Sequence, residues 1–407
     1  MKPQAAVGLL LAAVLLLVCA HLFWACQPAP QWTPEALPPL MQPHKCPCAD
    51  GGPACPRPSE SAARLYLPQG YGTAHLALLS ERGLSPMTQW IQARIHRHQH
   101  PERCDRLLIS DGHASGFGSE MHVIGAHLAY AMQNNYVLLL SNQTCKFFRV
   151  PHACADGCAC MFRPISNCTF EHTNASTPRV KSSPGMEETL AEAVVAALRA
   201  QFPSMTLSEM KYWWRGQSVA YLMRFSDDTL RVLRTLRHDP RLHYASHGCA
   251  VPFPLPANTI SAHIRGGDKH NEMPLVSAHA FASAILRLVH EMPHSFSRTV
   301  FVSGDDQRTI DEVRRLIEAR RMRFIYTRMP RRAGGHTFVD WRPTPDESEG
   351  SFYAHLLQLL MALEADAWVG TRGSNWNRLI DELRCVWVDK CQGVFVEAGV
   401  SPPRYAW

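Results

Sequence analysis

The chain has 407 residues, of which 46% are hydrophobic and 19% are charged, so it can bury a large core and is not disordered throughout. At roughly 150 residues per domain, this length predicts two to three domains. The 41 lysines and arginines against 35 aspartates and glutamates leave a net charge of +6. That excess is too small for a strongly basic nucleic-acid-binding protein and leaves room only for a local basic cleft.

The first segment is an apolar run at residues 5–24, interrupted by one titratable residue, His21. As a helix it would be about 30 Å long, which is the thickness of the hydrocarbon core of a bilayer. We therefore expect a cytoplasmic tail at 1–4 and an uncleaved signal anchor at 5–25, with a cleaved signal peptide as the alternative. Either reading places the rest of the chain in the secretory lumen.

Residues 26–62 are rich in proline and poor in β-branched residues, and they are expected to form an extended stem. Beyond it, N-x-S/T sequons make Asn142, Asn167 and Asn174 predicted glycosylation sites and support the lumenal location. The chain has fourteen cysteines, which also indicates an oxidising compartment. Twelve of them lie from Cys46 onward, and this even count does not define how they pair.

Two series of apolar runs make up the body of the chain. The first has a predicted strand at 107–110, a glycine-bearing loop at 112–118, a helical pattern from Met121 to Met132 and a strand at 136–140. The second has predicted strands at 259–264, 299–302, 323–326, 367–369 and 385–388, alternating with amphipathic stretches. Such alternation predicts an α/β fold with parallel sheets covered on both faces. We expect two Rossmann-like lobes, 63–250 and 251–407, with a ligand cleft between them at the carboxyl ends of strands.

The sharpest local pattern lies at residues 261–272, where a predicted strand runs into a loop of mixed charge. A glycine pair follows Arg265, and Asp268, Lys269 and Glu272 then crowd together. An arginine at the end of a strand can donate two hydrogen bonds to a diphosphate, and glycines let the backbone approach an anion. As a bare spacing the pattern is weak, and a solvated surface loop is the alternative.

Two further loops of small residues each precede a predicted helix. They are S-G-F-G-S at 115–119 and G-T-R-G-S-N at 370–375. The free N–H groups at the start of a helix can bind a phosphate, although either loop alone is more simply a tight turn. Three such loops in one chain, with an arginine among them, indicate a cleft for a nucleoside diphosphate.

Together these segments resemble those of the alpha-1,6-fucosyltransferases, the family of the N-glycan core enzyme and the rhizobial Nod-factor enzymes. The likeness extends over about residues 104–384 and is carried by segments in the same order: 116–118 with His122, 162–168, 213–224, 263–272, 300–306 and 365–374. Two departures stand out. The core enzyme has an arginine and a threonine where this chain has Gly266 and Gly267, and the family has a guanine-binding aspartate where this chain has Gln358.

The resemblance implies a GT-B-like fold and inverting transfer of fucose from GDP-fucose to a hydroxyl, for this family the 6-hydroxyl of a GlcNAc in the N-glycan core. Glu272 would be the general base, oriented by Lys269 and Asp268, and Arg265 would bind the β-phosphate. The diphosphate cradle and nucleoside contacts would come from residues of four segments: Gly116, Phe117, Gly118, Ser119, His263, Gln358 and Ser374. A disulfide between Cys104 and Cys168 is also implied.

No metal cofactor is expected, because the sequence contains no D-x-D triplet of the kind that holds Mn²⁺ on a diphosphate. Asp305 and Asp306 are adjacent in an extended segment and should point to opposite faces, so they are not expected to share a metal. The expected partners are GDP-fucose, a glycan or glycoprotein acceptor and, through the anchor, the Golgi membrane in a single-pass type II orientation. Nucleic acid is not expected as a partner.

Three alternatives stay open. The first is a fucosyltransferase acting on protein hydroxyls or on another glycan. The second is a non-catalytic lumenal glycan-binding relative, and the third is a metal-dependent transferase. The sequence does not define the oligomeric state.

Overall fold

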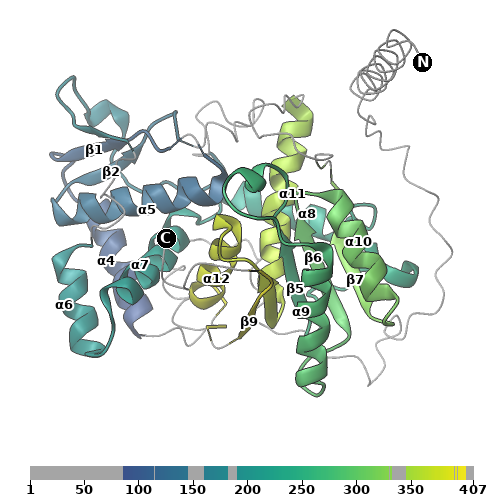
Figure 1. The fold of residues 1–407 in the computed structure, drawn as a ribbon. Coiled ribbons are helices and arrows are strands. Elements are labelled where there is room, and N and C mark those ends of the chain that lie inside the picture. Colours follow the sequence, from purple (N-terminus) through teal and green to yellow (C-terminus); the bar gives the residue numbers. More distant parts are fainter. Residues whose placement is uncertain are drawn as a thin grey trace, which may run out of the picture. The chain divides into compact units, whose positions relative to one another are not determined.

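The computed structural model describes residues 86–113, 115–144, 160–181, 190–329, 331, 345–388, 390–391 and 393–399. The expected tail at 1–4, anchor at 5–25 and stem at 26–62 lie outside these residues. In the part of the chain that is described, no helix is long and apolar enough to cross a membrane. The described elements all belong to one compact unit (Figure 1).

A three-stranded parallel sheet forms in the first half of the body. Its strands β1 (Leu107–Ser110), β2 (Val137–Leu140) and β3 (Arg179–Val180) lie in the order β2-β1-β3. Helix α5 (Phe117–Gln133) connects β1 to β2, so the predicted strand–loop–helix–strand unit is confirmed. Leu108 and Leu138 contribute to the main core of the molecule, whereas Ile109 and Leu139 belong to a small cluster that includes Cys168.

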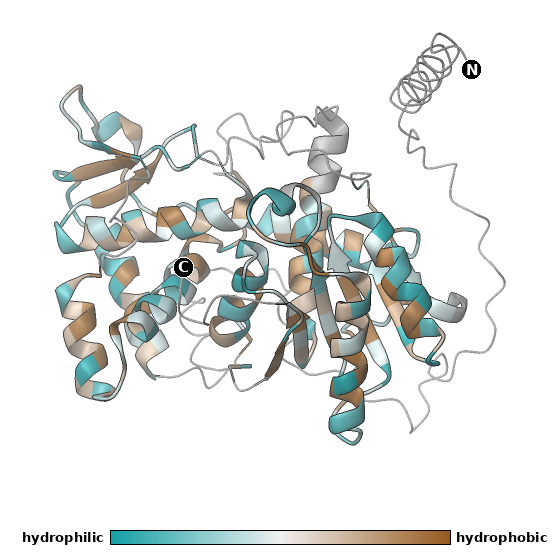
Figure 2. Cartoon of the chain, in the orientation of Figure 1, coloured by the Kyte–Doolittle hydropathy of each residue, from teal (hydrophilic) through white to brown (hydrophobic). Residues whose placement is uncertain are grey.

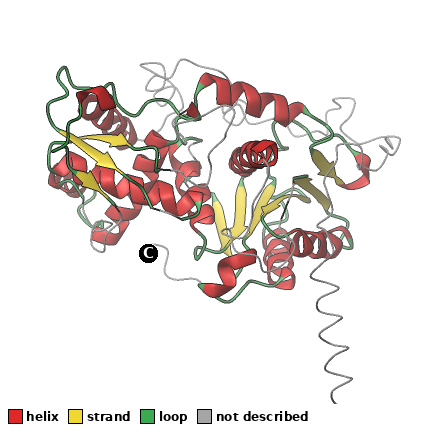
Figure 3. Ribbon diagram, turned by 90° about the horizontal axis from the view of Figure 1, so that it is seen from above, coloured by secondary structure: helices red, strands yellow, loops and turns green. Residues whose placement is uncertain are grey.

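The second sheet has six strands in the order β4-β7-β6-β5-β8-β9. Figure 3 shows strands in yellow with helices in red on either side of them. They are β4 (His243–Ala245), β5 (Ile260–Ile264), β6 (Thr299–Gly304), β7 (Arg323–Thr327), β8 (Ala367–Gly370) and β9 (Val394–Glu397), and all run parallel except β4. The central strands β5 and β6 are buried along their whole length, as a parallel sheet covered on both faces requires. The predicted α/β class is confirmed.

The order of the strands reverses at β5. From β5 the chain continues to β6 and β7 on one side, and it later returns to place β8 and β9 on the other side. In open α/β sheets, ligands bind at the carboxyl ends of the strands where the order reverses. The residues directly after β5 therefore occupy the place where the fold favours a site.

Helices cover both faces of this sheet. Along β6 the side chains alternate: Val300 and Val302 join the cluster under α9 (Ala278–Glu291) and α10 (Gln307–Glu318), and Phe301 joins the main core on the other face. The hydrophobic residues of α9 and α10 face the sheet and their polar residues face outward (Figure 2).

The main core contains residues from both sides of the predicted boundary at 250. It combines residues of α5, α7 (Leu207–Leu222) and α8 (Asp227–His238) with residues of α11 (Pro345–Glu364) and α12 (Asn375–Val386). Helix α12 packs mainly on α7 and α5, although it lies far from them in the sequence. Two further helices, α4 (Pro86–Gln99) and α6 (Glu192–Gln201), complete the first half.

The predicted strand at 385–388 is wrong. Cys385 and Val386 form the last turn of α12, and the final strand β9 follows only at residue 394. The run is apolar because Val386, Trp387 and Val388 are buried in the main core at the end of a helix. A short apolar run cannot by itself be assigned to a strand or to a buried helix end.

Candidate functional site

The segment after β5 carries the first group of predicted site residues. The chain passes from Arg265 through Gly266 into the short 3-10 helix η7 (Gly267–Asn271). Gly267 has a φ of 58°, a left-handed conformation that favours glycine, and a Cβ on Gly266 would lie 2.8 Å from the Cβ of Asp306. The backbone conformation therefore favours glycine at 267, and the close approach of Asp306 favours glycine at 266.

Arg265 is held by a carboxylate from the neighbouring strand. Its Nη1 donates to Oδ2 of Asp305, and the backbone N–H of Gly266 donates to Oδ1 of the same residue at 2.7 Å. The Arg265 side chain is 24% exposed, and its Nη1 also donates to the carbonyl of Gly266 at 3.0 Å. The sequence does not single out Asp305 as the partner of Arg265. The pairing follows from the register of the two strands: Ile264 of β5 lies opposite Gly304 of β6, and Arg265 and Asp305 are the next residues along the chain.

Asp306 has a separate role at the start of α10. Its carboxylate accepts from the N–H of Arg308 at 3.0 Å and from the hydroxyl of Thr309 at 2.6 Å, so it caps that helix. The neighbouring Asp305 is committed to Arg265 and Gly266. Among the described residues, no group of three His, Cys, Asp or Glu side chains is arranged to hold a metal ion.

Glu272 and Lys269 form an ion pair at the end of η7. The Lys269 side chain is 9% exposed and that of Glu272 is 63% exposed, so a sheltered ammonium group holds an accessible carboxylate. The Lys269 carbonyl also accepts from the N–H groups of Glu272 and Met273, both at 3.0 Å, which fixes the local backbone. The backbone of Asp268 lies in η7, and its side chain is outside the description. An exposed carboxylate in this position is suited to accept a proton.

The two glycine-containing loops meet at the N-termini of α5 and α12. Helix α5 begins after Gly116 and α12 begins after Ser374, and neither of these N-cap residues makes a side-chain capping bond. Gly118 lies so close to the backbone of Asn375 that a Cβ would be 2.8 Å from its carbonyl carbon. The Asn375 amide also donates to the hydroxyl of Ser119 at 2.9 Å.

Two helix N-termini side by side are a favourable place for an anion, because each carries free N–H groups and about half a unit of positive charge. The side chain of Phe117 is buried and packs against α11 and α12. Its ring centroid lies 5.7 Å from that of Phe352 and 6.0 Å from that of Trp376.

The end of β5 adjoins this pair of helix N-termini. A Cβ on Gly373, just before α12, would lie 2.4 Å from the sulfur of Met273, which directly follows Glu272. The side chain of Asn377 in α12 donates to the carbonyl of His263 in β5 at 3.4 Å. The structure therefore brings the three loops singled out in the sequence together at one edge of the sheet.

His263 is buried at this edge, and its Nδ1 pairs with the hydroxyl of Ser303 at 2.9 Å. Burial, with a contribution from the charge of Arg265, lowers the pKa of His263 to about 3, so the ring is neutral at physiological pH. Nε2 of this neutral ring can form a hydrogen bond but not an ion pair.

Gln358 projects from α11 toward the end of β6. Its side-chain oxygen accepts from the N–H of Gly304 at 3.3 Å, its amide nitrogen contacts the sulfur of Met329, and the residue is buried. The carbonyl of Gly304 accepts from the buried guanidinium of Arg331 at 2.9 Å. Gln358 thus supports the end of β6 beside the site through its own hydrogen bonds.

A buried charge cluster joins the helices behind the site. His122 of α5 bonds to Glu382 of α12 at 2.9 Å, both side chains are fully buried, and Nε of Arg215 in α7 lies 4.0 Å from the same carboxylate. Burial lowers the pKa of Arg215, and the charge of Glu382 opposes that effect. Only His122 had been singled out in the sequence. Arg215 and Glu382 stand among both polar and apolar buried residues of α7 and α12, so no local pattern marks them.

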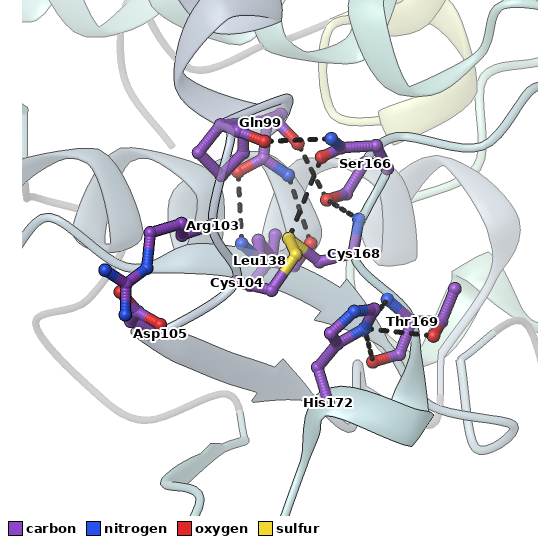
Figure 4. Close-up of a disulfide and its surroundings, with 11 residues drawn as sticks. Gln99, Arg103, Cys104, Asp105, Leu138, Ser166, Cys168, Thr169 and His172 are labelled. Atoms are coloured by element: carbon purple, nitrogen blue, oxygen red, sulfur yellow. Dashed lines mark hydrogen bonds and ion pairs between the residues drawn. A yellow bond between two sulfur atoms is a disulfide. The ribbon is translucent and has the colours of Figure 1, made fainter.

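The Cys104–Cys168 disulfide is present in the structure (Figure 4). It covers the face of the small sheet opposite α5, next to Gln99, whose side chain bonds to both the N–H and the carbonyl of Leu138 at 3.0 Å. Cys160 and Cys249 are also disulfide-bonded. The three sequon asparagines are exposed: Asn142, Asn167 and Asn174.

No protein-family model matches the sequence, and no curated protein matches it. Among solved structures, the chain is similar to POFUT1 in complex with GDP, at 11% identity and a TM-score of 0.36 over 74% of this chain and 100% of that chain. It is similar to the alpha-1,6-fucosyltransferase NodZ, a Bradyrhizobium protein, co-crystallised with GDP, at 13% identity and a TM-score of 0.38 over 69% of this chain and 92% of that chain. A mutant of Arabidopsis thaliana FUT1 in complex with GDP is 12% identical, with a TM-score of 0.36 over 81% of this chain and 79% of that chain. The NodZ protein is an alpha-1,6-fucosyltransferase, the family that the sequence segments resemble.

Proposed function

We propose that this protein is a GT-B-like glycosyltransferase that moves fucose from GDP-fucose to an acceptor hydroxyl with inversion at the anomeric carbon. The observation that carries the proposal is that the end of β5, which leads into Arg265, adjoins the N-termini of α5 and α12. These groups offer positive charge and free N–H donors at the point where the strand order reverses. A diphosphate is the ligand that such an arrangement fits best.

In this proposal Arg265 stabilises the negative charge that develops on the β-phosphate as GDP leaves. The ion pair with Asp305 and a hydrogen bond from Nη1 to the carbonyl of Gly266 at 3.0 Å hold this guanidinium at the end of β5. Gly116, Gly118, Ser119 and Ser374 line the converging helix N-termini. Preorganised donors of this kind contribute most where charge develops in the transition state.

Glu272 is proposed as the general base, with Lys269 holding its carboxylate and Asp268 as a further orienting residue. The acceptor oxygen attacks the anomeric carbon, its proton passes to Glu272, and the bond to the β-phosphate oxygen breaks to release GDP. General-base catalysis of this kind typically contributes about 10² to 10⁴ in rate. Neutral His263 and the neighbouring Gln358 would contact the nucleoside.

The acceptor and the location are also part of the proposal. The resemblance of the 213–224 and 263–272 segments supports the 6-hydroxyl of a GlcNAc in the N-glycan core, with protein hydroxyls or another glycan as the alternative acceptors. The Cys104–Cys168 disulfide and the exposed sequon asparagines support a Golgi membrane protein with a lumenal catalytic body. The absence of a D-x-D triplet from the sequence supports a reaction without a metal.

The direct test is to incubate the purified protein with GDP-fucose and a panel of N-glycans, other glycans and peptides, and to identify products by mass spectrometry. We expect fucose transfer that is unchanged by EDTA. Arg265→Ala should abolish GDP binding measured by calorimetry, whereas Glu272→Gln should retain GDP binding and lose at least about 10²-fold in kcat.

A matched control is Arg287→Ala, which removes an exposed arginine from α9 and should leave both readouts unchanged. Lack of transfer to every acceptor, with GDP binding intact, would favour the non-catalytic alternative. Undiminished turnover in Arg265→Ala would refute the mechanism, and loss of turnover in EDTA would favour a metal-dependent transferase.

A further inference from the structure

Two cysteines lie together where α12 ends and the chain turns toward β9. The carbonyl of Arg384 accepts from the N–H of Lys390 at 2.8 Å, which closes the backbone into a loop. Cys385 and Cys391 are the residues that directly follow these two, so the loop closure places them side by side. Both are present as thiols, one half-buried and one exposed, and the Cys385 thiol is in hydrogen-bond contact with Cys391.

The residues next to the two cysteines fix both ends of this loop. Lys390 Nζ donates to the carbonyls of Glu364 and Ala365 at 2.8 and 2.9 Å and pairs with Asp366 at 2.9 Å. Arg384 donates to the carbonyl of Gly393 at 2.9 Å. Because these contacts hold the backbone on each side of the thiol pair, little conformational freedom remains to be lost when the sulfurs bond.

We propose that Cys385 and Cys391 form a disulfide in the mature protein, closing the turn between α12 and β9. The chain already uses this chemistry, since Cys104 is bonded to Cys168 and both Cys160 and Cys249 are in disulfides. A protein that acquires those bonds meets an oxidant during its maturation. The inference does not depend on the proposed function.

The bond would form by two thiol–disulfide exchange steps with an external disulfide, such as that of a dithiol oxidoreductase or oxidised glutathione. The Cys391 thiolate attacks the external disulfide, forms a mixed disulfide and releases one thiolate. Cys385 then loses its proton and attacks the sulfur of Cys391, which releases the second thiolate. Two protein thiols are oxidised and one external disulfide is reduced to two thiols.

The order of these steps follows from the surroundings of the two thiols. Hydrogen bonding to Cys391 and burial both raise the pKa of the Cys385 thiol, so it is a poor first nucleophile. Cys391 is exposed and can reach the external oxidant.

Peptide mapping of the full chain, expressed in a eukaryotic secretory pathway, tests the proposal. The protein is denatured and alkylated at low pH without reductant, and it is then digested with trypsin. Trypsin cuts after Arg384, Lys390 and Arg404, so the two cysteines fall in separate peptides, 385–390 and 391–404. We expect these peptides to be recovered mainly as one linked species, which separates into two after reduction.

Two outcomes would overturn the proposal: recovery of both peptides mainly in alkylated form without reduction, or linkage of either one to a different cysteine peptide. The variants Cys385→Ser and Cys391→Ser provide a check on specificity. Each should make the remaining cysteine fully accessible to alkylation in the denatured, unreduced protein. If the remaining cysteine stays blocked in either variant, it has another partner and the assignment is wrong.

Discussion

Replacement of Glu382 tests whether the buried charge cluster holds the two helices of the site together. Glu382 lies in α12 with a fully buried side chain, bonds to His122 of α5 at 2.9 Å and lies 4.0 Å from Arg215 of α7. The N-termini of α5 and α12 meet at the proposed diphosphate site, and Ser119 and Asn375 bond there. The bond between Glu382 and His122 therefore fixes the relative position of α12 and α5 behind the point where their N-termini meet.

Glu382→Ala leaves the Arg215 guanidinium buried without this counter-charge, and it removes the carboxylate that bonds to His122. Removing one member of a buried ion pair typically costs about 3–5 kcal/mol in the free energy of unfolding. For a folded body of this size, about 2 °C in Tm corresponds to each kcal/mol, so we expect Tm to fall by roughly 6–10 °C. Glu382→Gln keeps the volume and an acceptor for His122 and should cost about 1–3 kcal/mol.

The assay is thermal unfolding followed by circular dichroism, together with GDP binding by calorimetry below the transition. Glu291→Ala is the control, because it removes an exposed glutamate at the end of α9 and should change Tm little. We expect GDP affinity to fall in the Glu382 variants and not in the control. If Glu382→Ala unfolds within about 1 °C of the native protein, the cluster contributes no net stability and the reasoning is refuted.

Two further predictions follow from the close packing of Gly118 and from the burial of three histidines. Gly118→Ala should lower Tm and weaken GDP binding, because the new Cβ would lie 2.8 Å from the backbone of Asn375. Gly116→Ala is the control and should leave Tm unchanged, because a Cβ there would have no atom within 4 Å. Equal Tm values for the two variants would contradict the close contact at Gly118. Burial lowers the pKa of His263 to about 3, and that of His127 and His243 to about 4. The unfolded chain protonates these rings near pH 6.5 and the folded chain does not, so the free energy of unfolding should fall by up to about 2 kcal/mol per ring between pH 7 and pH 5. Urea unfolding at the two pH values checks this, and equal stability at both would show that the rings are not held neutral.

Much of the fold could be predicted because apolar periodicity is a local property of the chain. The strands at 107–110 and 259–264 and the helix predicted from Met121 to Met132 are found close to where the pattern placed them. The apolar run at 385–388 misled the prediction, because burial at the end of a helix and burial in a strand leave the same local signature.

The sequence by itself determined the α/β class, the parallel sheets and the loops that carry Arg265, Gly118 and Ser374, since each depends on residues close together in the chain. Only the tertiary structure decided which distant groups meet. The pairing of Arg265 with Asp305 follows from the register of β5 on β6, and the contact of Gly118 with Asn375 follows from the packing of α12 on α5. Register and packing depend on how surfaces far apart in the sequence fit together, and no local pattern of residues specifies that fit.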